Sequence, residues 1–254
     1  MRRDSGIEAV AAPARSKASE PIAALLDAAV RRFAPAGRVA VGFARGKLRY
    51  DPVYLELLRR GLVPDGARVL DLGCGQGTLF ALLLAAREQY RAGRWPVDWP
   101  APPLRLSLRG IERAGADARR ARLALGREAE IEGADLRVAR LAPSDVVVLL
   151  DVLHYLEELA QERLLAAVAD AVAPGGLLLM RVGDATAGAA ALLTRVVDHL
   201  VALARGRGVH RLHFRAIPQW IALLERLGFA VDVEPMSEGT LFANVLLVAR
   251  KHRG

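Results

Sequence analysis

Apolar and polar residues along this 254-residue chain form blocks in which short apolar runs alternate with longer segments of helical periodicity. The short runs have the length of buried β-strands, and the longer segments repeat their apolar residues at helical spacing. The predicted strands are residues 68–72, 106–111, a weak one near 131, 146–150 and 177–182. The predicted helices between them are residues 78–90, 115–126 and 157–173. This alternation favours an α/β fold, with a mostly parallel sheet covered by helices on both faces.

The end of the chain departs from this alternation. Residues 229–233 and 244–249 are apolar runs with no room for a helix between them, which predicts an antiparallel hairpin. The Pro-Gly-Gly sequence at 174–176 predicts a turn before the strand at 177–182. The sequence therefore predicts a mostly parallel sheet that ends in one antiparallel hairpin.

The residues before the first predicted strand form a helical segment of their own. Ser19 and Pro21 predict a helix start, and Pro35 ends the apolar periodicity that follows. A second helix is predicted over residues 51–60, and the mixture of Ala, Ser, Pro and charge in residues 1–18 predicts a disordered leader. The expected organisation is a leader at 1–18, an N-terminal helical cap at 19–63 and a main α/β domain at 64–254 with a lid insertion at about 185–215.

Composition narrows the classes of function. The net charge is +8, but nearly all of the positive charge is arginine scattered through an alanine-rich sequence, which weakens a nucleic-acid interpretation. No apolar run reaches the length of a membrane span, and the start of the chain lacks the apolar core of a secretory signal. The single cysteine excludes an internal disulfide and a multi-cysteine metal site. We therefore expect a cytoplasmic protein without a metal centre.

The junction after the first predicted strand carries the most informative motif. Asp71 ends the strand, and Gly73, Gly75 and Gly77 follow at alternate positions before the helix begins. Glycine is needed where the backbone adopts positive φ and where a ligand lies against bare backbone. The dinucleotide fingerprint G-x-G-x-x-G requires its third glycine at the position that Thr78 occupies. The spacing therefore predicts a small ligand other than a dinucleotide.

This motif resembles the first motif of the class I S-adenosylmethionine (SAM)-dependent methyltransferases, and the resemblance extends over about residues 64–250. It implies a Rossmann-like sheet of seven strands in the order 3-2-1-4-5-7-6, with helices on both faces and an antiparallel terminal hairpin. It also implies SAM as the cofactor. The main domain would then be a SAM-dependent methyltransferase domain.

Acidic residues at the ends of strands are the next candidates for cofactor contact, because parallel sheets bind ligands at that edge. Glu112 ends the second strand, and its carboxylate can accept hydrogen bonds from both hydroxyls of a ribose. In the family that it resembles, an acidic residue at this position holds the SAM ribose. Asp135 matches a short acidic motif that meets the adenine amino group, with the backbone N–H of Leu136 facing adenine N1.

The resemblance assigns further roles around the glycine loop. Asp71 helps to hold the loop and the methionine amino group, and the three glycines bring the backbone close to the cofactor. Cys74 is interpreted as a small packing residue in the cofactor loop, because no basic partner lies nearby in the sequence. Asp151 ends the strand that matches the fourth motif, where it would face the methyl-bearing sulfonium. Asp151 could also cap the following helix, and the two roles are compatible.

His154 is the candidate catalytic base, because imidazole titrates near neutrality and this residue follows the fourth motif. A packing role for His154 is the alternative. Asp184, His213 and Glu238 are candidates for substrate contact, since they lie after the strand at 177–182, in the following segment and in the terminal hairpin. Whether oxygen, nitrogen or carbon is methylated stays open.

The segment after the fifth strand bears on the acceptor. Residues 185–204 have an amphipathic helical pattern that is expected to cover an apolar or aromatic substrate. A basic cluster follows at Arg205, Arg207, His210, Arg211, His213 and Arg215. The cluster is either a solvated loop or a surface that receives a substrate carried by an acidic acyl carrier protein.

Two further comparisons of motifs concern the substrate. Base-methylating enzymes of DNA and RNA share an Asn/Asp-Pro-Pro-Tyr/Phe fourth motif, whereas this chain has Asp-Val-Leu-His at 151–154. The ending at 235–245 resembles methyltransferases of bacterial aryl polyene and fatty-acid-type gene clusters. Both favour a small apolar, aromatic or carrier-bound acceptor in secondary metabolism. An RNA methyltransferase and a SAM-binding protein without catalysis are the alternatives.

Overall fold

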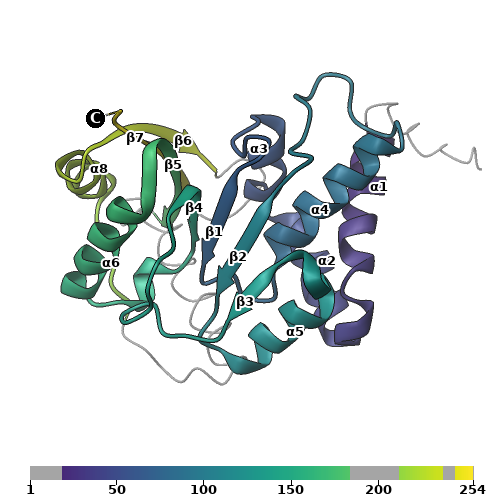
Figure 1. Ribbon diagram of the computed structural model, residues 1–254, viewed down its shortest axis with the longest axis horizontal. Helices are drawn as coiled ribbons and strands as arrows, with labels where there is room; N and C mark the ends of the chain where they lie inside the picture. The colour runs from purple at the N-terminus through teal and green to yellow at the C-terminus, as the bar shows by residue number, and fades with distance from the viewer. Residues whose placement is uncertain (1–18, 184–211, 237–243, 254) are drawn as a thin grey trace, which may run out of the picture.

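The computed structural model describes residues 19–183, 212–236 and 244–253, which contain a seven-stranded sheet with the strand order β3-β2-β1-β4-β5-β7-β6 (Figure 1). The strands are β1 (Arg68–Leu72), β2 (Ser107–Ile111), β3 (Glu130–Glu132), β4 (Ser144–Leu150), β5 (Val172–Gly183), β6 (Phe229–Pro235) and β7 (Asn244–Lys251). Strands β1 to β5 pair in parallel, and β7 is antiparallel to both β5 and β6. The predicted fold class, strand order and terminal hairpin are confirmed.

Helices cover both faces of the sheet. The α-helices are α1 (Ser19–Arg31), α2 (Arg38–Tyr50), α3 (Val53–Arg59), α4 (Thr78–Arg91), α5 (Gly115–Leu125), α6 (Glu158–Ala171) and α8 (Ile217–Arg226). Short 3₁₀ turns are η1 (Ala34–Ala36), η2 (Gly126–Glu128) and η3 (Leu153–Tyr155). Figure 1 shows α1, α2, α4 and α5 on one side of the sheet and α6 and α8 on the other. Among the described residues, no helix combines the length and the apolar character needed to cross a membrane.

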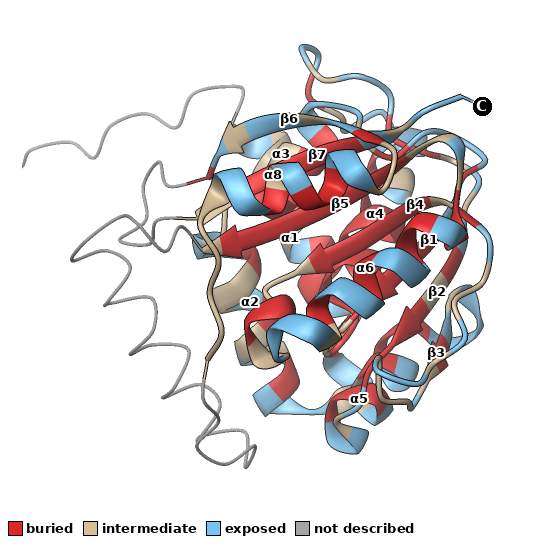
Figure 2. Cartoon of the chain, turned by 90° about the vertical axis from the view of Figure 1, so that its left-hand side faces the viewer, coloured by how far each residue is buried: buried red, intermediate tan, exposed pale blue. Residues whose placement is uncertain are grey.

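The central strands are buried on both faces, which explains why they are continuous apolar runs in the sequence (Figure 2). Val146 and Val148 of β4 pack into the core on the α4 side. Val147 and Leu149 point to the opposite face and pack with α6 and α8. The sheet therefore forms a rigid middle layer whose strand ends can position a site.

Helix α2 is an element that the periodicity did not predict. Gly42 and Gly46 lie within it, and each glycine lowers helix propensity by about 1 kcal/mol relative to alanine. Tertiary packing outweighs this cost, because Ala40, Ala44 and Leu48 form a buried stripe that packs into the core shared with α1 and α4. The predicted helix at 51–60 begins two residues later, at Val53 of α3.

Strand β5 is longer than the apolar run that predicted it. Ser144 pairs with Val172, and the next pair along the ladder joins Val146 to Leu177. The Pro-Gly-Gly sequence at 174–176 therefore forms an irregularity inside β5, and the prediction that it is a turn before the strand is wrong. The strand continues across it because Val172 finds a partner on β4 beyond the irregularity.

Candidate active site

The carboxyl ends of β1, β2, β4 and β5 open onto a cavity of about 1340 Å³. The glycine loop after β1, the loops after β2 and β4, and helix α2 contribute to its wall. This is the edge at which parallel α/β sheets bind ligands. Among the described residues, no group of three or more His, Cys, Asp or Glu side chains could hold a metal ion.

The three glycines of the loop have two different functions. Gly73, Gly75 and Gly77 all adopt positive φ, at 78°, 56° and 77°. A Cβ at Gly73 would lie 2.5 Å from Val152 Cγ2, and one at Gly77 would lie 2.6 Å from Leu125 Cδ1. At Gly75 a Cβ would meet nothing within 4 Å, and this residue lines the cavity. Two glycines therefore allow close packing, and Gly75 offers bare backbone to a ligand.

Glu112 connects the glycine loop to the end of β2. Its Oε2 accepts a hydrogen bond from the Gly75 N–H at 3.0 Å, and its Oε1 accepts one from the Ala114 N–H at 2.7 Å. The residue is only 5% exposed and lines the cavity. Two backbone donors thus fix the carboxylate in place, and a carboxylate accepts hydrogen bonds from a vicinal diol.

Asp71 and Cys74 lie beneath and within the loop. Burial and, to a smaller extent, the nearby Glu112 carboxylate together raise the pKa of the Asp71 carboxyl to about 7. Asp71 is not among the residues that line the cavity. Cys74 lies against β2, where its Sγ would be 2.7 Å from a Cβ added at Gly110. Burial raises the pKa of this thiol well above its usual value, which makes it a poor nucleophile.

Asp135 and Leu136 line the cavity on the β2 side. The Asp135 carboxylate accepts a hydrogen bond from Arg137 Nη2 at 2.6 Å and another from the Arg137 backbone N–H at 3.0 Å. The hydrogen bond from the Arg137 side chain lowers the pKa of Asp135 to about 2. The carboxylate is therefore ionised near neutral pH.

Asp151 lies at the end of β4 and lines the cavity, as the sequence predicted. Helix α6 has Glu157 at its N-cap position, so the interpretation of Asp151 as the cap of that helix is wrong. Asp151 has φ of 59° and is the only non-glycine residue with positive φ in the described part of the chain. Aspartate tolerates this backbone better than most non-glycine residues, at some cost in free energy, and such residues cluster at functional sites.

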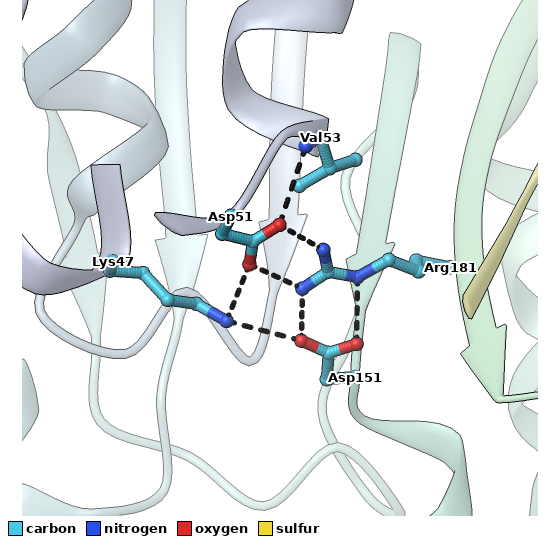
Figure 3. Close-up of polar contacts among 5 residues, drawn as sticks. All are labelled: Lys47, Asp51, Val53, Asp151 and Arg181. Atoms are coloured by element: carbon cyan, nitrogen blue, oxygen red, sulfur yellow. Dashed lines mark hydrogen bonds and ion pairs between the residues drawn. The ribbon is translucent and has the colours of Figure 1, made fainter. Parts of the chain in front are cut away.

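The strain at Asp151 accompanies a cluster of four charges, which we call the ion cluster: Lys47, Asp51, Asp151 and Arg181 (Figure 3). Arg181 Nη2 lies 2.8 Å from Asp51 Oδ2, and Arg181 Nε lies 2.8 Å from Asp151 Oδ1. Lys47 Nζ lies 2.8 Å from Asp51 Oδ2 and 3.3 Å from Asp151 Oδ2. The charges of two cations and two anions therefore cancel at the place where α2 meets the ends of β4 and β5.

Burial alone would raise the pKa of Asp151, but Arg181 and then Lys47 outweigh it and hold the pKa well below its usual range. The pKa of Lys47 is raised although burial opposes this, with Asp151 as the main cause. Both groups are therefore charged near neutral pH. Lys47 and Asp51 were not predicted as site residues, because they lie at the end of a helix and belong to no motif.

Arg181 was not predicted as a site residue either. The sequence feature that could have revealed it is a charged residue inside an apolar strand.

His154 lies on η3 and lines the cavity. Its ring stacks on Phe214, with centroids 5.6 Å apart and an interplanar angle of 14°. Its backbone carbonyl accepts a hydrogen bond from the His213 N–H at 2.9 Å. Burial lowers the pKa of His154 to about 4, against the influence of Asp151, so the imidazole is neutral near pH 7.

The segment that carries Phe214 is fastened to α6. Gln161 Nε2 donates to the backbone carbonyls of Leu153 and His213, at 3.0 and 3.1 Å. Arg215 Nε donates to Gln161 Oε1 at 2.8 Å. The guanidinium of Arg215 is thus used within the chain, and the prediction that it belongs to an exposed basic cluster is wrong.

Of the remaining candidates for substrate contact, one lies within the described residues and two lie outside them. His213 lines the cavity, as expected for a substrate contact. Asp184, Glu238, the predicted lid at 185–204 and the rest of the basic cluster, at 205–211, lie outside the described residues. The predicted leader at 1–18 lies outside them as well.

Two further polar side chains, which were not predicted as site residues, line the cavity. Gln76 and Thr78 are 4% and 2% exposed, and both lie beside the bare backbone of the glycine loop. Gln76 Oε1 and Thr78 Oγ1 are buried and have no hydrogen-bond partner within the described part of the structure. Their signal in the sequence was polarity at two positions next to Gly77, where the motif itself requires no side chain.

Comparison with known proteins places this cavity in context. A family model described as a methyltransferase domain matches residues 43–234. No curated protein matches the sequence. An O-methyltransferase family protein from Burkholderia thailandensis is 21% identical, with a TM-score of 0.59 over 88% of this chain and 62% of that chain.

Two other solved structures are similar. NcsB1, an O-methyltransferase from neocarzinostatin biosynthesis, was solved in complex with SAM and 2-hydroxy-5-methyl naphthoic acid. It is 22% identical, with a TM-score of 0.54 over 83% of this chain and 55% of that chain. A SAM-dependent methyltransferase from Mesorhizobium loti is 23% identical, with a TM-score of 0.53 over 76% of this chain and 95% of that chain. This chain spans less than two thirds of the length of the two O-methyltransferases. At these identities the similarity shows a shared fold.

Proposed function

The chain belongs to the methyltransferase-domain family, and from this we propose that it transfers the methyl group of SAM to a hydroxyl of a small aromatic acceptor. The observation that carries the proposal is the composition of the cavity wall. One end has bare glycine backbone and the fixed carboxylate of Glu112, and the other end has the stacked rings of His154 and Phe214. A cofactor and an acceptor can thus bind side by side.

The cofactor end fits SAM in its donor and acceptor groups. Gly75 leaves space next to its backbone, because a Cβ there would meet nothing within 4 Å. We assign Glu112 to the ribose hydroxyls, and Asp135 with the Leu136 N–H to the adenine edge. Gly73, Gly77 and Cys74 shape the loop, and Asp151 lies at the sulfonium end. When bound, SAM supplies a methyl group that its positive sulfur activates for transfer.

The acceptor end is assigned to His154, Phe214 and His213. A planar aromatic ring packs favourably against the stacked rings, which brings its hydroxyl oxygen into line with the methyl group. Neutral His154 takes the hydroxyl proton as the oxygen–carbon bond forms. Asp151 favours the protonated imidazole that results, because its negative charge opposes the effect of burial. Asp184 and Glu238 are also assigned to acceptor contact, from the sequence alone.

The similar proteins support the acceptor class without defining the compound. NcsB1 was solved with a hydroxylated naphthoic acid, and it belongs to neocarzinostatin biosynthesis. We propose that this chain also acts in secondary metabolism, on a hydroxylated aromatic compound. The alternative, suggested by the basic cluster, is that the methyl acceptor is attached to an acyl carrier protein that delivers it to the site.

The test is an incubation of the protein and SAM with a panel of hydroxylated aromatic acids and phenols, free and attached to a carrier protein. Mass spectrometry measures the methylated product and S-adenosylhomocysteine (SAH). We expect O-methylation of at least one free aromatic compound and much slower transfer by His154→Gln. Labelled methyl that appears only in RNA would replace the proposal with an RNA methyltransferase. Cofactor binding without transfer to any acceptor would make the chain a binding protein.

A further inference from the structure

We infer that the side chains of Gln76 and Thr78 bind the amino-acid end of SAM, and that Asp71 does not contact it. This inference rests on the proposed function, since it concerns the same cofactor. It differs from the expectation drawn from the sequence, which assigned the methionine amino group to Asp71. Three features of the glycine loop carry the argument.

The first feature is a pair of unsatisfied polar atoms. Gln76 Oε1 and Thr78 Oγ1 are buried without a hydrogen-bond partner in the described part of the chain, and both residues line the cavity. Burial of a polar atom without a partner is destabilising, so native proteins pair nearly all such atoms. Two of them on one stretch of cavity wall indicate a ligand whose polar groups complete the pairing.

The second feature is the chemistry of the two side chains. Gln76 Oε1 can only accept hydrogen bonds, so its partner must be a donor, and the ammonium of an amino acid has three. Thr78 is the first residue of α4, a helix of 14 residues, and the N-cap residue Gly77 provides no side-chain cap. The free N–H groups of the first turn and the Thr78 hydroxyl can donate to a carboxylate, which the helix dipole also favours. Gln76 can therefore bind the ammonium of an amino acid, and Thr78 with the helix N-terminus can bind its carboxylate.

The third feature is the position of Asp71. Asp71 pairs with Gly110 of β2 and with Val148 of β4 in the middle of the sheet, and its side chain is buried. It is not part of the cavity wall, whereas Gln76 and Thr78 are. Gly75, next to Gln76, leaves its backbone open to the cavity. Gly75, Gln76 and Thr78 would therefore hold the methionine chain of SAM, with Gln76 and Thr78 at its amino-acid end.

The experiment compares two ligands by isothermal titration calorimetry. SAH carries the amino-acid end, and 5′-methylthioadenosine has the same adenosine and sulfur without it. The variants are Gln76→Leu and Thr78→Val, which remove the polar atoms at nearly constant volume, and Thr78→Ser, which keeps the hydroxyl. Gln89→Leu is the matched control, because Gln89 is a buried glutamine of α4 that bonds Arg94 away from the cavity. Thermal unfolding without ligand is measured for each variant.

We expect Gln76→Leu and Thr78→Val each to weaken SAH binding by about tenfold or more, the usual effect of losing a hydrogen bond to a charged group. Binding of 5′-methylthioadenosine should not change, Thr78→Ser should bind SAH like the wild type, and Gln89→Leu should bind both ligands normally. The melting temperatures of Gln76→Leu and Thr78→Val without ligand should not fall, because no hydrogen bond is lost.

Three results would overturn the inference alone: SAH affinity unchanged in both variants, an equal loss of affinity for the two ligands, or a melting temperature that falls as it does in Gln89→Leu. Wild-type protein that binds neither SAH nor SAM would overturn the proposed function, and this inference with it. An Asp71→Asn variant that loses affinity for SAH but not for 5′-methylthioadenosine would return the ammonium to Asp71.

Discussion

The two ends of the cavity are built in different ways. The cofactor end, as we assign it, consists of backbone groups and strand-end carboxylates, such as the hydrogen bond from the Gly75 N–H to Glu112 at the end of the neighbouring strand. The acceptor end, as we assign it, depends on contacts between residues that are far apart in the sequence, such as Gln161 with His213, which are 52 residues apart. A site can therefore keep a common cofactor motif while its acceptor wall is assembled from elements that carry no motif.

The contrast has an electrostatic side as well. At the cofactor end, single carboxylates are held by backbone N–H groups or by an exposed arginine. The ion cluster at the ends of β4 and β5 instead pairs two carboxylates with two cations around the buried Arg181. Removal of one member of this cluster leaves a partly buried charge without its partner, so we expect the ion cluster to be more sensitive to single substitutions than the cofactor end.

The largest effect is expected from Arg181→Met, which removes a buried cation and leaves the half-buried Asp51 and Asp151 with only Lys47 as a cation. Loss of one partner from a buried ion pair destabilises proteins by about 3–5 kcal/mol. Urea unfolding of the variant and the wild type measures this difference. The control is Arg105→Met, since Arg105 pairs with Asp65 on the surface. Equal losses of stability in the two variants would contradict a structural role for the ion cluster.

The next effect is on catalysis. We expect His154→Gln to lower kcat by about a hundredfold or more, the usual contribution of a general base, while SAH affinity is unchanged. Because the pKa of His154 is lowered to about 4, kcat of the wild type should stay level as the pH falls from 8 to about 5. A kcat that His154→Gln leaves unchanged would restore the packing interpretation of this residue.

A smaller effect is expected on cofactor binding. Glu112→Gln keeps the shape of the side chain but removes the charge that accepts two ribose hydroxyls, which should weaken SAH binding by about tenfold. Glu132→Gln on the neighbouring strand β3 is the matched control, because Glu132 pairs with Arg109. Calorimetry that gives the same affinity for both variants would remove Glu112 from the cofactor site.

The smallest effect concerns the dependence of stability on pH. The folded protein holds the pKa of Asp71 at about 7, above the usual value of 3.8, so the stability that this group contributes is present below pH 3.8 and is lost as the pH rises through 7. The wild type should therefore lose roughly 1.4 kcal/mol per pH unit relative to Asp71→Asn between pH 5 and pH 6.

His154 acts in the opposite direction, because its folded pKa is lowered, and stability is lost as the pH falls from 6.5 toward 4. Both proteins share this contribution, so their difference isolates Asp71. Urea unfolding of the wild type and Asp71→Asn at the two pH values provides the measurement. Parallel pH profiles would mean that the Asp71 carboxyl titrates normally.

The fold and the cofactor end could be predicted from sequence because their signals are local. Alternating strands and helices, the absence of room for a helix between 233 and 244, and the glycine spacing after Asp71 each lie within a short stretch of chain. Steric rules then decide the outcome, because a residue with a side chain at Gly73 or Gly77 would collide with its neighbours in a strained backbone. Such constraints act on any sequence that folds this way.

The acceptor end could be predicted only in part. His154 follows a motif, was named as a candidate base and lines the cavity. Lys47 and Asp51 belong to the end of a helix that was not predicted, because its two glycines lower helix propensity. Nothing in the sequence pairs them with Arg181, because the contact depends on how α2 packs across the sheet. The wrong interpretation of Asp151 as a helix cap has the same origin. A cap is a local role that the sequence suggests, whereas the ion pairs of Asp151 join residues far apart in the sequence.

The most direct measurement is a crystal structure of the protein with SAH. We expect the ribose hydroxyls at Glu112, the amino-acid end at Gln76 and Thr78, and the sulfur facing the space beside His154 and Phe214. SAH bound with its sulfur turned away from His154, or bound outside this cavity, would contradict the claim that the two ends form one methyl-transfer site.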